Sequence, residues 1–101
     1  MSMTDAVTLN PVNDTTVFSS LVNEEKFRQM IERIPVFLRA IAQEKVSQKA
    51  ESITRQENRR EVTEKDMVDA FFSETPFGFH GPMKSDMEAL GIDYTKYGHP
   101  Q

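Results

Sequence analysis

Pro35 is the residue that most constrains the fold, because it separates two helical patterns that would otherwise run together. Proline lacks a backbone N–H and disfavours the α conformation at the preceding residue, so a helix must end or kink at Ile34. Upstream of this joint, apolar residues recur at i, i+3, i+4 and i+7, the spacing of one helix face. They are Phe27, Met30, Ile31 and Ile34. The pattern predicts a first helix that is N-capped by Asn23 and buries this stripe.

The longest helix is predicted directly after the joint, since proline is well tolerated at the first position of a helix. It runs from about Pro35 to Gln56, roughly 33 Å at 1.5 Å per residue. Its apolar face is predicted to comprise Leu38, Ile41, Ala42, Val46, Ala50 and Ile53, with Phe37 assigned to the core beside it.

A third helix is predicted from about Glu64 to Phe72, after a polar linker at 58–61. The sequence Thr63-x-x-Asp66 is similar to a capping box, with Asp in place of the preferred Glu or Gln. Thr63 is therefore the expected cap of this helix.

The pattern changes in residues 74–101, which begin with a loop containing two Pro and two Gly. A short fourth helix is predicted to start at Pro82 or Met83 and to stop at Gly91, a suitable residue just past a helix end. Residues 97–101 are expected to fray.

The predicted fold class is all-α: a compact bundle of three to four helices with a long central helix and a mobile N-terminal leader. Residues 1–22 are the flexible leader, 23–73 the helical domain, and 74–101 an aromatic loop, short helix and tail packed on the same domain. The predicted core comprises Phe27, Met30, Ile31, Ile34, Phe37, Leu38, Ile41, Ala42, Val46, Ile53, Val62, Met67, Val68 and Phe71.

Composition excludes several classes of function. Among the 101 residues there is no cysteine, which excludes disulfides, thiolate catalysis, Fe–S ligation and cysteine-based zinc sites. A net charge of −4 argues against nonspecific nucleic-acid binding. No apolar run approaches the roughly 20 residues that span a bilayer, and the N-terminus has no signal-peptide pattern. We therefore expect a cytoplasmic protein that does not contact a membrane.

The sequence contains no recognisable catalytic, cofactor or metal motif. His80 and His99 stand in separate loops, without the spacing of helical metal ligands. No carboxylate pair stands out as a general acid and base, and no Gly-rich phosphate loop is present. We expect no catalytic, cofactor-binding or metal-binding residues, and a protein that is not an enzyme.

Two surfaces are candidates for interaction. Phe77, Phe79 and His80 lie in the aromatic loop, where the two Phe either cap the core, the favoured interpretation, or present an apolar surface to a partner.

The second surface is basic and comprises Arg55, Arg59 and Arg60. A solvated helix end is the favoured interpretation, because cations suit the negative end of the helix dipole. Contact with an anion or a nucleic acid is the alternative.

Residues 24–72 resemble a known family in the order of their pieces. These are a short helix, Ile34-Pro35-Val36-Phe37-Leu38-Arg39, a charged helix with Lys45-Val46 and Lys49-Ala50, and a helix opened by Val62-Thr63 and Asp66-Met67. The order is similar to the small helical domain at the C-terminus of the B subunit of light-independent protochlorophyllide reductase. The chain lacks the Trp that commonly precedes the first helix in that family, and it lacks the large reductase body. The resemblance therefore implies an accessory module linked to tetrapyrrole metabolism, without reductase activity.

A weaker resemblance is to the second half of a histone fold, which also has a long helix, a basic linker and a Val-Thr-x-x-Asp helix opening. That resemblance implies a dimer, with weak nucleic-acid contact from Arg55 to Arg60. The leading expectation is a non-enzymatic accessory or protein-interaction module with a protein partner. A homodimer, histone-like nucleic-acid binding, and binding of a flat tetrapyrrole through Phe77, Phe79 and His80 are the alternatives.

Overall fold

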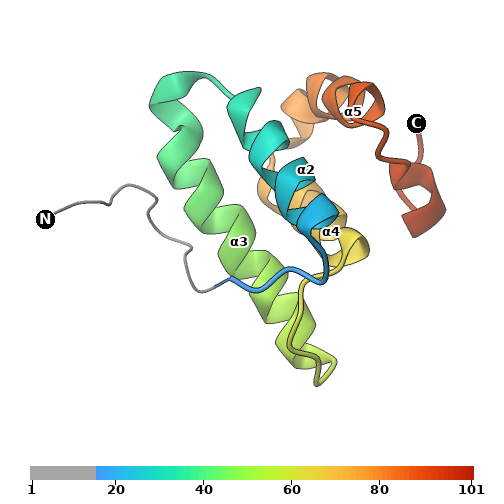
Figure 1. Ribbon diagram of the computed structural model, residues 1–101. Helices are drawn as coiled ribbons and strands as arrows, with labels where there is room; N and C mark the ends of the chain where they lie inside the picture. The colour runs from blue at the N-terminus through green and yellow to red at the C-terminus, as the bar shows by residue number, and fades with distance from the viewer. Residues whose placement is uncertain (1–15) are drawn as a thin grey trace, which may run out of the picture.

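Residues 16–101 of the computed structural model are described, and over this range the chain is helical apart from turns and one isolated β-bridge (Figure 1). The all-α fold class is confirmed, whereas most of the predicted leader lies outside the described residues. The α-helices are α2 (Leu21–Glu32), α3 (Arg39–Gln56), α4 (Glu64–Glu74) and α5 (His80–Ala89). Three short 3₁₀ helices accompany them: η1 (Val36–Leu38), η2 (Phe77–Phe79) and η3 (Tyr94–Tyr97).

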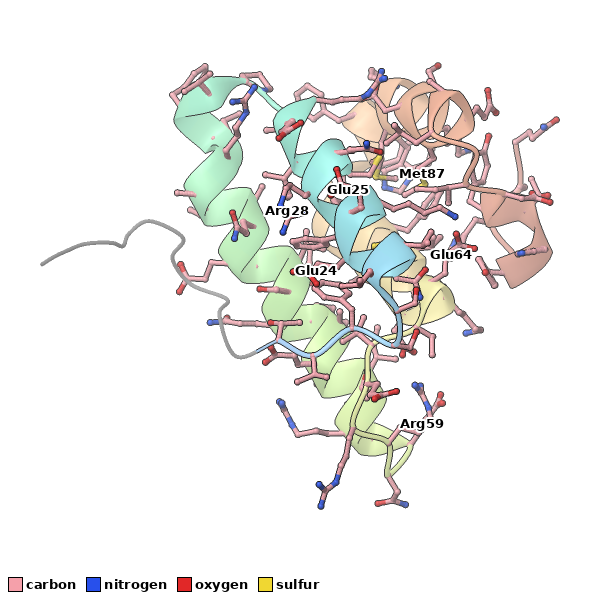
Figure 2. The ribbon with its side chains drawn as sticks, in the orientation of Figure 1. Glu24, Glu25, Arg28, Arg59, Glu64 and Met87 are labelled. Carbon is pink, nitrogen blue, oxygen red and sulfur yellow. The ribbon has the colours of Figure 1, made fainter. Side chains whose placement is uncertain are left out.

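The long helix α3 packs mainly against α4, and α2 lies across both (Figure 1). Small residues allow this close approach, since Ala50 of α3 and Ala70 of α4 are both fully buried. The charged side of α2 faces outward, where Arg28 forms ion pairs with Glu24 and Glu25 (Figure 2).

The start of α2 differs from the prediction. Ser20 is the N-cap, and its hydroxyl accepts a hydrogen bond from the Asn23 backbone N–H at 3.1 Å. Just before it, Phe18 forms a parallel β-bridge with Val62, and its ring packs on Phe27 with 5.4 Å between centroids. The predicted N-cap at Asn23 is therefore wrong, and the segment before α2 is anchored on the core.

Pro35 does form a joint, but α3 does not begin there. Pro35 has an extended conformation, with φ −50° and ψ 140°, so the helix starts only after the η1 turn. Arg39 closes the joint, because its guanidinium donates hydrogen bonds to the carbonyl oxygens of Ile34 and Glu32 at 2.8 and 2.7 Å. The Glu32 carbonyl is one of those that the end of a helix leaves without an intrahelical donor, and Ile34 lies just beyond the C-cap Arg33.

Three predicted core residues are on the surface. Phe37 is 83% exposed, Ile41 53% and Leu38 42%, so these predictions are wrong. The reason is non-local: α4 ends at Glu74 and the chain turns away, so no described segment covers the first turns of α3. Ile34, Ala42 and Ile53 are partly buried, and the remaining predicted residues are buried: Phe27, Met30, Ile31, Val46, Val62, Met67, Val68 and Phe71.

The C-terminal segment completes the core instead. Met83, Met87, Ile92 and Tyr94 are all buried, and Met87 is on the inner face of α5 (Figure 2). The helix α5 starts at His80, earlier than predicted, and Gly91 follows its end with a φ of +76°, a conformation that favours glycine.

The predicted fraying of residues 97–101 is wrong, because the tail contacts α4. The ring of His99 stacks on Phe72 with 4.0 Å between centroids, and its Nε2 lies 2.7 Å from Asp69 Oδ1. Tyr97 donates a hydrogen bond to Glu64 at 2.5 Å. These contacts hold the tail against α4. No helix in residues 16–101 has both the length and the apolar character needed to cross a membrane.

The burial of the α2 stripe predicts a contrast between two substitutions on the same helix. Ile31→Asp should lower the free energy of unfolding by at least about 3 kcal/mol, because it places an unpaired charge in the core. Leu21→Asp, at a position that is 83% exposed, should change it by less than about 0.5 kcal/mol. Urea unfolding followed by circular dichroism measures both, and equal effects would contradict the assigned face of α2.

Candidate functional site

Two proline corners give the molecule its most distinctive surface. The first comprises residues 35–38 and the second residues 76–79. Both prolines are extended, with ψ near 140°, and each accepts a hydrogen bond at 2.9 Å that closes a 3₁₀ turn, from Leu38 in the first corner and Phe79 in the second. Each corner then leads into an α-helix, and the first turns of α3 and α5 lie toward the same end of the molecule (Figure 1).

An apolar groove of about 470 Å³ lies between the two corners. Its floor is formed by the buried side chains Met30, Val46, Phe71 and Met83. One wall comes from the end of α2 and the start of α3, with Ile34, Leu38 and Ile41, and the other from the second corner, with Pro76, Phe79 and Pro82. The groove is therefore an open continuation of the hydrophobic core.

Large apolar side chains of the two corners are also exposed. Phe77 is 87% exposed, Phe37 83%, Val36 73% and Phe79 64%. The favoured interpretation of Phe77 and Phe79 as caps of the core is therefore wrong. We call the groove together with Val36, Phe37, Phe77 and Phe79 the apolar face.

His80 contacts the backbone and two aromatic rings next to the second corner. Its Nε2 lies 2.9 Å from the carbonyl oxygen of Thr75, and its ring meets Phe72 edge-on and Phe77 at an angle. The contact ties the start of α5 to the end of α4. His80 and His99 contact the same Phe72 ring, which sequence spacing could not indicate.

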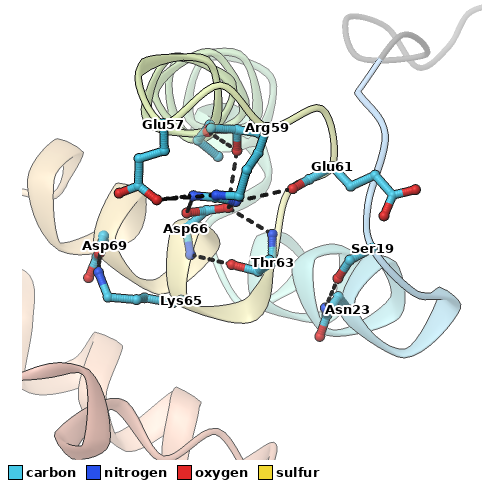
Figure 3. A network of polar contacts seen from close by, with 11 residues as sticks. Ser19, Asn23, Glu57, Arg59, Glu61, Thr63, Lys65, Asp66 and Asp69 are labelled. Atoms are coloured by element: carbon cyan, nitrogen blue, oxygen red, sulfur yellow. Dashed lines mark hydrogen bonds and ion pairs between the residues drawn. The ribbon is translucent and has the colours of Figure 1, made fainter.

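Arg55, Arg59 and Arg60 all line one small hollow, but Arg59 is committed to Asp66. The Arg59 guanidinium donates to both Asp66 carboxylate oxygens at 2.7 and 2.8 Å, and to Glu57 at 2.7 Å (Figure 3). Such a two-pronged pair fits the planar fork of arginine. The guanidinium of Arg59 thus joins the linker to α4.

Asp66 is buried, and several donors converge on it. Its carboxylate accepts hydrogen bonds from the Thr63 backbone N–H at 2.9 Å and the Thr54 hydroxyl at 3.1 Å. In return, the Asp66 N–H donates to the Thr63 hydroxyl at 3.2 Å, so the predicted capping box is present (Figure 3). Burial alone acts to raise the pKa of Asp66, but the hydrogen bonds from Arg59, Thr63 and Thr54 outweigh it and lower the pKa to about 2.

Arg55 and Arg60 remain at the surface. The Arg55 side chain is 69% exposed and lies 3.9 Å from Glu51, a distance typical of a weak surface pair. Arg60 has no ion-pair partner within residues 16–101, and with Arg55 and Arg59 it lines the small hollow, of about 260 Å³, beside Val17 and Val62. The three arginines therefore meet at one hollow, but the charge of Arg59 is already paired with Asp66 and Glu57.

Glu64, a carboxylate whose side chain is only 15% exposed, also has structural partners (Figure 2). Lys26 donates to it at 2.6 Å and Tyr97 at 2.5 Å. Although burial opposes it, these bonds lower the pKa of Glu64, and burial together with the same bond raises the pKa of Tyr97 above its usual range. Within residues 16–101, no group of three or more His, Asp or Glu side chains could hold a metal ion.

Comparison with known proteins places the chain in a family. A family model described as a protein of unknown function (DUF2621) matches residues 12–100, so the chain belongs to this family. No curated protein and no solved structure shows a significant match.

The converging donors on Asp66 predict a stability that depends on acid pH. Asp66→Asn should lower the free energy of unfolding by about 2–3 kcal/mol at pH 7. Because the pKa of folded Asp66 is below the unfolded value of about 3.9, this contribution is complete above about pH 4 and is lost as the pH falls toward 2. The difference between wild type and variant should therefore shrink over that range.

Urea titrations at pH 7, 4, 3 and 2.5 measure this difference. Asp86→Asn is the control, since it removes a more exposed pair with Arg33, at 3.2 Å, and should cost less than about 1 kcal/mol. A difference between wild type and Asp66→Asn that stays constant from pH 7 to 2.5 would refute the ionised, hydrogen-bonded state of Asp66.

Proposed function

We propose that this member of the DUF2621 family is a non-enzymatic protein-interaction module that docks its partner on the apolar face. The observation that carries the proposal is the continuity between the groove and the core. Met30, Val46 and Phe71 belong to the core and also form the groove floor. A site built on the core is held in shape before any partner arrives, which lowers the entropic cost of binding.

Chemistry and surface composition support docking over catalysis. The apolar face is formed by aliphatic and aromatic side chains, and its ionisable groups stand at the rim. The partly buried ionisable groups Asp66 and Glu64 each have several hydrogen-bond partners, and His80 is bonded to the backbone. A general acid or base needs a proton-transfer partner in a cleft, and these groups are instead used to hold helices together.

The accessory role and the link to tetrapyrrole metabolism rest on the resemblance of residues 24–72 to the protochlorophyllide reductase domain. A cytoplasmic location rests on the sequence pattern alone. Binding of a flat tetrapyrrole stays an alternative, because Phe77 and Phe79 are exposed near His80. Axial ligation by His80 Nε2 would require loss of its contact with Thr75, and an unshifted haem absorbance spectrum on titration would end this alternative.

Photo-crosslinking tests the docking proposal directly. Benzoylphenylalanine placed at Phe79, on the groove wall, should form a covalent adduct with the partner in cells that express the chain. The same group at Leu21, which is 83% exposed and outside the groove lining, should not form that adduct. Ile41→Glu in the Phe79-labelled chain should abolish the adduct, because it places a charge on the opposite wall. Failure to form any adduct from Phe79 would refute docking at this face.

Histone-like nucleic-acid binding receives less support, because Arg59 is engaged with Asp66 and Glu57. Arg55 and Arg60 remain available for phosphate contact. A duplex-DNA titration at low and moderate salt distinguishes the two functions. We expect weak binding that Arg55→Ala/Arg60→Ala barely changes, whereas affinity that falls steeply with salt and is lost in that double variant would favour the nucleic-acid alternative.

A further inference from the structure

We propose that the occupant of the apolar face is a second copy of this chain, docked across a two-fold axis. The inference rests on the proposed docking function and names its partner. In a two-fold interface the same surface meets itself, so any hollow needs a matching projection on that surface and any cation a matching anion. The apolar face meets each of these conditions.

The first condition is shape. The groove of about 470 Å³ is a hollow, and Phe79 on its wall is 64% exposed, while Phe37 and Phe77 are exposed in the same two corners. A protein cavity of about 150 Å³ is large enough to bind benzene, so the groove has room for more than one phenyl ring. The hollow and these rings belong to the same pair of corners, so a ring of one copy can enter the groove of the other in a two-fold contact.

The second condition is area. A buried aromatic side chain covers roughly 150–250 Å², so three phenylalanines exposed by about two-thirds or more present on the order of 400 Å². Val36, Leu38 and Ile41 extend this area, with exposed fractions of 73, 42 and 53%. A stable interface needs about 800 Å² from each partner. The apolar side chains therefore supply about half or more of the required area, and the surrounding rim can supply the rest.

The third condition is charge. Lys45 lines the groove from α3, and Glu74 lines it from the end of α4. Within residues 16–101 Lys45 has no ion-pair partner, and Glu74 accepts only a hydrogen bond from Ser73, at 3.2 Å. Arg33 and Asp86, the other charged lining residues, already form an ion pair with each other at 3.2 Å. Each copy thus offers one unused cation and one unused anion.

A two-fold contact can satisfy both unused charges at once. The Lys45 ammonium of one copy would meet the Glu74 carboxylate of the other, and the symmetry would repeat the pair. The two charges cancel within each copy, so the lining carries no net charge that would favour a strongly acidic or basic partner. This balance favours a second copy over an unrelated charged helix.

Sedimentation velocity of the purified full chain over a concentration series tests the dimer. We expect a monomer–dimer equilibrium with Kd on the order of micromolar. Ile41→Glu should raise Kd at least tenfold, whereas Val17→Glu should leave it unchanged. Both positions are 53% exposed, and Val17 lies outside the groove lining, so the pair is matched. Circular dichroism and thermal melting check that each variant is folded.

A charge exchange identifies the two-fold pairing itself. Lys45→Glu and Glu74→Lys should each weaken the dimer several-fold, because each places two like charges opposite each other. The double variant should restore the wild-type Kd, a result that a purely structural effect of either substitution would not give. A wild-type chain that sediments as a monomer at hundreds of micromolar overturns the dimer, as does a double variant that is weaker than both single variants.

The crosslinking experiment separates failure of the dimer from failure of the docking function. An adduct with twice the mass of the chain, from benzoylphenylalanine at Phe79, supports both proposals. An adduct with a different protein and none between copies overturns the dimer and leaves the docking function supported. The lack of any adduct overturns docking at this face, and with it the dimer.

Discussion

The rest of the structure depends on the carboxylate of Asp66. Thr54 lies on the last turn of α3, Arg59 in the linker and Thr63 at the cap of α4, and all three donate hydrogen bonds to it. A buried carboxylate with fewer partners would destabilise the fold, because its loss of hydration would not be compensated. With these partners, it fixes where α3 ends and α4 begins. Val62, in the same linker, then enters the core and pairs with Phe18.

The hydrogen bonds of Asp66 lie at one end of the α3–α4 pair, and at the opposite end the core is open to solvent. At the Asp66 end, linker, cap and bridge all close over the core. At the other end α4 stops at Glu74, and the two proline corners lead the chain into α3 and α5. Because no described segment covers the space between the corners, the core continues outward as the apolar groove. Polar bonds therefore close the core at the Asp66 end, and the apolar groove lies at the opposite end, where such bonds do not cover it.

This division also explains what the sequence could predict. The buried positions Phe27, Met30 and Ile31 on α2 and the Thr63 cap were predicted correctly, because both signals lie within one or two helical turns. Ile34, in contrast, lies beyond the end of α2 and is only partly buried. The burial of Phe37, Leu38 and Ile41 was predicted wrongly, because it depends on where α4 ends, more than thirty residues later. Arg59 was assigned to a solvated helix end, since local charge counting does not show that Asp66 faces it. For the candidate site, Phe77 and Phe79 were found from the sequence, but their neighbours Leu38 and Ile41 were assigned to the core.

The position of the exposed apolar residues favours recognition over chance exposure. Single surface hydrophobic residues are normal, whereas a contiguous apolar surface around a hollow is unusual for a monomer unless it binds something. Here Val36, Phe37, Phe77 and Phe79 all come from the two corners, where each proline holds the turn in a fixed conformation. The rings are therefore presented on short, bonded turns that feed directly into helices. Rigid turns lose little conformational entropy when a partner covers them. A partner can therefore bind this end of the molecule with a small entropic penalty.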